Sequence, residues 1–131
     1  MSSIFENPNF VLMEKVAGKP AISITKNGIG FSKQVLSRLK YSHFVLIYIN
    51  KVDKQIAIKA CERDTPGAIR FVPETKTKID SLRWNSPSFK ADIQNLVSKD
   101  ISRENFVCEG DYFEDDDALL FDFTKARSLE K

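Results

Sequence analysis

The sequence predicts an α+β fold in which mostly antiparallel β-strands are combined with two short helices. Apolar runs with strand periodicity alternate with polar turns along the 131 residues. Two helical segments each begin with a serine, and each is followed by two strand-like runs. We therefore expect one domain, residues 1–131, built by internal duplication. Its two strand–helix–hairpin units lie at about residues 21–61 and 78–126, and a connector joins them.

The first strands are predicted near the start of the chain. Residues 10–16 form a largely apolar run, and residues 21–25 alternate with a period of two. Gly18 and Pro20 provide turn chemistry between them, so we expect these two strands to pair as a hairpin. The dipeptide Asn27-Gly28 then predicts a second turn.

The rest of the first unit follows from the same local patterns. Ser32 is placed to cap a short helix at residues 33–39, whose apolar residues share one face. Residues 44–49 form an unbroken apolar run, which predicts a strand buried on both faces. A polar turn leads into the alternating strand at residues 55–60.

The second unit repeats this order after a connector, which contains a strand candidate at residues 68–72. Residues 78–84 are expected to be a strand. Ser86 and Pro87 then begin an amphipathic helix that extends to about residue 99. Two further strands form the closing hairpin, and the acidic run at residues 114–117 is its turn; these strands are residues 105–112 and 118–123.

The net charge of +2 is the sum of two unequal parts. Residues 1–83 carry 14 Lys and Arg against 7 Asp and Glu, whereas residues 84–131 carry 6 against 11. This asymmetry is typical of a nucleic-acid-binding face, a self-assembly surface or two solvated faces. The sequence contains no apolar run of membrane-spanning length and no secretory signal, so we expect a cytoplasmic protein without a membrane partner.

The residues that usually carry catalysis are sparse. His43 is the one histidine, and it has no neighbour arranged for nucleophilic chemistry. Cys61 and Cys108 are expected to be buried thiols rather than a disulfide, and no CxxC motif is present. We therefore expect a protein that is not an enzyme and has no metal site and no cofactor.

A basic cluster around the first helix is the clearest candidate site. We expect Lys26, Lys33, Arg38 and Lys40 to contact phosphates of double-stranded DNA. A solvated surface is the simpler alternative, because lysines commonly serve solubility.

The first unit also resembles a known family. The run FSKQVLSRLKY at residues 31–41, followed by VLIYI at 45–49 and QIAI at 55–58, is similar to the swapped-hairpin DNA-binding module of AbrB/MazE-type transcription factors. The resemblance implies intertwined dimeric sheets with basic residues that face DNA. By position, Lys33 matches a basic residue of the family, whereas Ser32 stands in place of its Pro and Lys40 in place of its Gly.

Two functions remain open at this point. The first is a DNA-binding, transcription-regulatory protein of prokaryotic type. The second is a protein–protein interaction or self-assembly module, in which a protein partner or a second copy of the chain binds.

Overall fold

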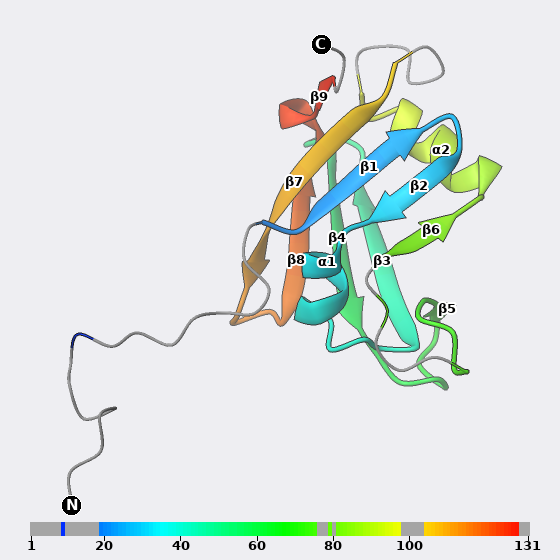
Figure 1. The fold of residues 1–131 in the computed structure, drawn as a ribbon, viewed down its shortest axis with the longest axis vertical. Coiled ribbons are helices and arrows are strands. Elements are labelled where there is room, and N and C mark those ends of the chain that lie inside the picture. Colours follow the sequence, from blue (N-terminus) through cyan, green and yellow to red (C-terminus); the bar gives the residue numbers. More distant parts are fainter. Residues whose placement is uncertain (1–8, 10–18, 76–78, 80, 98–103, 129–131) are drawn as a thin grey trace, which may run out of the picture.

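The computed structural model describes residues 9, 19–75, 79, 81–97 and 104–128. These residues form one antiparallel sheet that curls into a half-barrel (Figure 1). The prediction of an α+β fold is therefore wrong. The two helices, α1 (Lys33–Arg38) and α2 (Pro87–Gln94), are short insertions between strands and do not build a helical layer.

The strands occur in the spatial order β5-β3-β4-β8-β7-β1-β2-β6, with β9 paired to β7. A short 3-10 helix, η2 (Phe123–Lys125), follows β8. The strands are β1 (Ala21–Thr25), β2 (Gly28–Phe31), β3 (Phe44–Asn50), β4 (Gln55–Ala60), β5 (Ile69–Arg70), β6 (Leu82–Trp84), β7 (Phe106–Phe113), β8 (Ala118–Asp122) and β9 (Arg127–Ser128).

The core fills the concave side of the half-barrel. The strand period of two turns every second side chain inward, so Ile56 and Ile58 on β4 and Leu119 and Phe121 on β8 are fully buried. Because β4 and β8 pair directly, these four side chains form a continuous apolar layer at the centre of the sheet. Burying each of them contributes about 1.5–3 kcal/mol.

The first predicted hairpin is wrong. Strand β1 pairs with β2 on one side and with β7 on the other, so neither of its edges is open to residues 10–16, which lie outside the described residues. Strand β2 was not predicted, because Asn27-Gly28 indicated only a turn at this point of the sequence. Gly28 has a φ of +131°, and a Cβ there would lie 2.6 Å from the Trp84 carbonyl oxygen. Glycine is therefore required where β2 meets β6.

Both helices begin at the predicted serines, but the two side chains act differently. Ser86 Oγ accepts a hydrogen bond from the Phe89 N–H at 3.3 Å and caps α2. Ser32 makes no such bond to α1, and its Oγ instead accepts from the Ala21 N–H at 2.9 Å. Ser32 thus joins the start of β1 to the start of α1. Helix α2 ends at Gln94, earlier than its apolar periodicity suggested.

The two predicted units contribute one hairpin each to the middle of the sheet. The β3–β4 hairpin lies beside the β7–β8 hairpin, because β4 pairs with β8. The acidic run at residues 114–117 is the β7–β8 turn. A common origin of the two units stays a prediction from the sequence pattern.

Candidate functional site: a groove at the open edge of the sheet

The half-barrel is open between strands β3 and β6. Strand β6 pairs with β2 on one side only, and β3 is covered on its outer side by β5 at just two residues, Phe44 and Val45. In the described part of the chain, no strand pairs with the outer side of β3 beyond Val45. Among the described residues, the sheet therefore has two free edges here, the outer side of β3 beyond Val45 and the outer side of β6.

The hydrogen bonds at the start of β3 show which backbone groups face this opening. The Cys61 N–H donates to the Phe44 carbonyl on the β4 side, and the Phe71 N–H donates to the His43 carbonyl on the β5 side. Because alternate residues of an antiparallel strand direct their N–H and C=O groups to opposite sides, Ile47 and Ile49 direct theirs away from β4. These groups are the donors and acceptors that an added strand needs.

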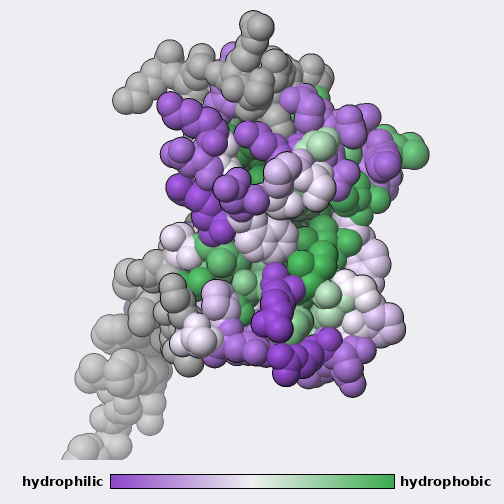
Figure 2. Space-filling model, turned by 90° about the vertical axis from the view of Figure 1, so that its right-hand side faces the viewer, coloured by the Kyte–Doolittle hydropathy of each residue, from purple (hydrophilic) through white to green (hydrophobic). Residues whose placement is uncertain are grey.

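A hollow of about 540 Å³ lies beside this edge. This is the volume of a typical small binding site, and it can hold a few side chains. Figure 2 looks onto this side of the molecule and shows hydrophobic residues along the hollow. We call it the β3–β6 groove. Its apolar lining consists of Ile47, Ile49, Ile69, Trp84 and Phe89.

The aromatic part of the lining is held from behind by the core. The Trp84 ring packs edge-to-face on Phe31, Phe71 and Phe89, with ring centres 4.9, 5.7 and 5.6 Å away. Phe31 and Phe71 are buried in the core, so their contacts hold the Trp84 ring in one position. One wall of the groove is therefore preformed, whereas Ile69 on the opposite wall is 41% exposed.

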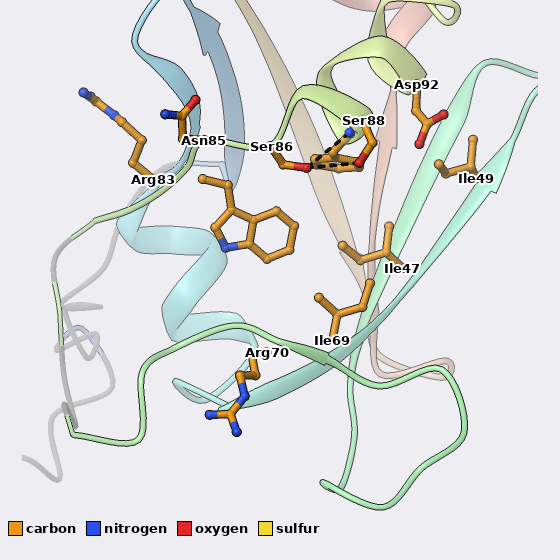
Figure 3. A pocket seen from close by; sticks show the side chains of 11 residues that line it. Ile47, Ile49, Ile69, Arg70, Arg83, Asn85, Ser86, Ser88 and Asp92 are labelled. Carbon is orange, nitrogen blue, oxygen red and sulfur yellow. Dashed lines mark hydrogen bonds between the residues drawn. The ribbon is translucent and has the colours of Figure 1, made fainter.

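Charged residues lie at the rim of the groove. In Figure 3, Ile47, Ile49 and Ile69 point into the cavity, Arg70 reaches outward from its lower end, and Asp92 descends from α2 toward Ile49. The Arg70 guanidinium carbon lies 5.8 Å from the centre of the Phe44 ring. Among the described residues no ion pair is found for Arg70 or Arg83. The groove therefore has an apolar floor, a basic end at Arg70 and an acidic group toward Ile49.

The structure brings together only part of the predicted DNA-contacting set. Lys33 and Arg38 lie on α1, and Lys40 follows it. Lys26 lies in the β1–β2 turn, at the far end of β2 from α1 (Figure 1), and lines the same small hollow as Lys90 of α2. Lys26 is thus separated from the other three cations.

Acidic residues adjoin the basic residues of α1. The Arg38 guanidinium carbon lies 5.4 Å from the centre of the Tyr112 ring. The Tyr112 hydroxyl donates to Asp117 Oδ1 at 2.6 Å, and this hydrogen bond raises the pKa of Tyr112 above its ordinary value. Since Asp117 belongs to the acidic β7–β8 turn, negative charge lies close to Arg38 and weakens the positive potential there.

The remaining candidate groups have structural roles. His43 Nδ1–H donates to the Val72 carbonyl at 2.9 Å. This hydrogen bond links the segment that follows β5 to the residue that precedes β3. Cys61 and Cys108 are free thiols. Burial, together with the nearby charges of Asp122 and Glu109, raises the pKa of Cys108 to about 12. Within the described ranges, no group of three metal-ligating side chains comes together.

The groove was not predicted, because the unbroken apolar run at residues 44–49 indicated a strand buried on both faces. Instead, Tyr48 is 57% exposed, and Ile47 and Ile49 are only partly buried. An unbroken apolar run also fits an edge strand that a partner covers. Local patterns cannot separate these two cases, because the difference depends on which strand lies next to β3.

Comparison with known proteins found no match: no family model, no curated protein and no solved structure matches the chain. Across the residues that the structure describes, neither helix has the length and apolar character needed to cross a membrane.

Proposed function

We propose that this protein is a protein-interaction module that binds an extended segment of a partner as an added β-strand. The observation that carries the proposal is the outer edge of β3, where the backbone groups of Ile47 and Ile49 lie next to a preformed apolar groove. Addition of a strand to a free edge is a common mode of peptide recognition. Backbone hydrogen bonds supply affinity in this mode, and pockets for alternate side chains supply specificity.

The groove also indicates the chemistry of the segment. Apolar side chains at alternate positions would pack on Ile47, Ile49 and Trp84. A carboxylate of the bound segment near Arg70 would form an ion pair with this arginine, which has none among the described residues. Two free thiols support a reducing, cytoplasmic setting for this interaction.

Trp84 provides the test, because it is the one tryptophan of the chain and it lines the groove. The probe is a ten-residue synthetic peptide of alternating valine and threonine that carries one glutamate. We expect saturable binding that shifts Trp84 emission. A copy of the peptide that is N-methylated on the edge-facing amides loses two hydrogen bonds of about 1 kcal/mol each, which weakens binding about 30-fold.

A pair of variants on β3 separates the groove from the rest of the strand. Ile47→Asp places a charge in the groove, whereas Tyr48→Asp alters the neighbouring, outward-facing residue. We expect the first variant to abolish peptide binding and the second to retain it. Equal binding by both variants, or equal binding of the methylated and unmethylated peptides, would overturn the proposal.

DNA binding is a second candidate, and one observation favours it. Lys33, Arg38 and Lys40 lie on or directly after a single short helix, where they can reach adjacent phosphates. The acidic turn beside Arg38 and the distance of Lys26 make this candidate weaker than strand binding.

A further inference from the structure

We propose that the segment bound in the β3–β6 groove carries a phosphorylated side chain, and that its phosphate lies between Lys26 and Lys90. This inference rests on the proposed function, because it names the chemistry of the segment that the groove takes. The phosphate site is a hollow of about 210 Å³, which we call the Lys26–Lys90 hollow. It lies between the β1–β2 turn, which supplies Lys26, and α2, which supplies Lys90.

The hollow adjoins the groove. Three residues at the connection between β6 and α2 line both of them, namely Trp84, Asn85 and Ser86. In Figure 3, Asn85 and Ser86 lie at the upper end of the groove, and Arg70 lies at its lower end. A segment that occupies the groove and continues past Asn85 therefore brings its next side chains to the hollow.

The hollow concentrates positive charge. Of the described residues that line it, two are lysines and none is acidic. Neither Lys26 nor Lys90 forms an ion pair within the described part of the chain. Two like charges that face one hollow repel each other, and an anion placed between them offsets this repulsion. The charge of the hollow therefore favours an anionic group of the partner.

Arg83 adds a third cation beside the hollow. A Cβ placed on Gly28, which lines the hollow, would lie 3.3 Å from Arg83 Cγ, so the arginine side chain begins next to it. Arg83 is exposed, and in Figure 3 its guanidinium points away from Ile47 and Ile69. Since no ion pair is found for Arg83 among the described residues, its guanidinium is available to a phosphate oxygen at the mouth of the hollow.

Phosphate fits these cations better than a carboxylate does. A phosphorylated serine carries a charge of about −1.5 to −2 at pH 7 and three acceptor oxygens, whereas a glutamate carries a single charge. Lysine binds phosphate as a point charge, and arginine binds it through paired donors. Two lysines and one arginine thus match the charge of a phosphate. The other end of the groove offers one arginine, Arg70, which suits one carboxylate.

The test compares three peptides that differ at one residue. Each is the alternating valine and threonine peptide with its glutamate at one end, and it carries serine, phosphoserine or a second glutamate at the other end. Both orders of the two ends are made, because parallel and antiparallel strands place them oppositely. Binding at low salt is followed by Trp84 emission. In the order that binds best, we expect phosphoserine to bind about tenfold more tightly than serine, with glutamate in between.

A pair of double variants assigns this preference to the hollow. Lys26→Gln/Lys90→Gln removes both lysine charges, and we expect it to lose most of the preference for phosphoserine while it binds the serine peptide as wild type does. The control is Lys51→Gln/Lys59→Gln, which removes the same charge from two exposed lysines that line neither the groove nor the hollow. We expect the control to keep the preference. An equal loss in both double variants would contradict a phosphate site at the hollow.

The outcomes separate this inference from the proposed function. If wild type binds the serine and phosphoserine peptides equally, or the glutamate and phosphoserine peptides equally, the phosphate site is refuted and strand binding stands. If none of the three peptides binds, the proposed function is refuted as well. A single-stranded oligothymidylate of similar length is tested alongside. If it binds through Lys26 and Lys90 while phosphoserine gives no gain, the cations serve a nucleic acid and the inference is wrong.

Discussion

The Arg38 guanidinium lies against the Tyr112 ring, 5.4 Å from its centre, and Tyr112 is in turn hydrogen-bonded to Asp117. This relationship joins the most basic short helix of the molecule to its most acidic turn. A surface that looks cationic in the sequence is thus partly neutralised by residues that lie more than 70 positions further along the chain.

The DNA-binding candidate can be tested through the separation of Lys26 from α1. Binding of random duplex DNA is measured by fluorescence anisotropy from low to physiological salt. If α1 contacts DNA, Lys33→Glu/Arg38→Glu abolishes binding, whereas Lys26→Glu changes it little because Lys26 lies beside α2. Three phosphate contacts give a slope of log K against log salt concentration of about −3. An equal loss in Lys26→Glu contradicts the assignment of the contact to α1.

Replacement of Ser32 by alanine is expected to destabilise the fold. The change removes the Oγ acceptor of the Ala21 N–H and leaves that donor without its partner at the start of β1. We expect the free energy of unfolding to fall by about 1–2 kcal/mol, measured by urea denaturation. The control is Ser88→Ala, since Ser88 is exposed and its Oγ lies 3.3 Å from Ser86 Oγ. A cost for Ser32→Ala no larger than that of the control would show that the Ser32 bond adds no stability.

Replacement of Gly28 by alanine is expected to weaken the pairing of β2 with β6. The new Cβ would lie 2.6 Å from the Trp84 carbonyl oxygen, at a backbone φ of +131°. Gly67 provides a matched control, because its φ is also positive at +87° but the nearest atom to a Cβ there is a Leu46 methyl carbon at 3.5 Å. We expect Gly67→Ala to lower the free energy of unfolding by about 1 kcal/mol and Gly28→Ala to lower it by more. Thermal unfolding followed by Trp84 emission measures both, and the reverse order contradicts the close approach.

Cys108 is expected to make stability fall in alkaline solution. Its pKa is about 12 in the folded chain and 9.0 in the unfolded one, so only the unfolded thiol ionises as the pH rises above 9. The stabilising contribution is complete below pH 9 and is lost progressively between pH 9 and 12. Urea midpoints measured from pH 8 to 10.5 should therefore fall less in Cys108→Ala than in wild type. Parallel curves for the two proteins would show that the Cys108 thiol ionises equally in both states.

Local patterns in the sequence predicted the position of most strands but not their pairing. The alternation in β4 and β8 and the Ser86–Pro87 start of α2 are properties of neighbouring residues, and the structure contains them. The pairing of β1 with β7 joins residues more than 80 positions apart and has no local signal. The groove is harder still to predict, because it depends on β3 and β6 not pairing.

Strand β8 lies at the centre of the sheet although it follows β1 to β7 in the sequence. It pairs with β4 on one side and β7 on the other, so residues 118–122 join the two hairpins. The β4–β8 ladder connects residues about 60 positions apart, and among the described residues no segment before β8 pairs with that side of β4. A nascent chain therefore leaves the inner edge of β4 exposed until Asp122 has left the ribosome. Folding is accordingly expected to be slow and late, as it is for sheets dominated by distant pairings.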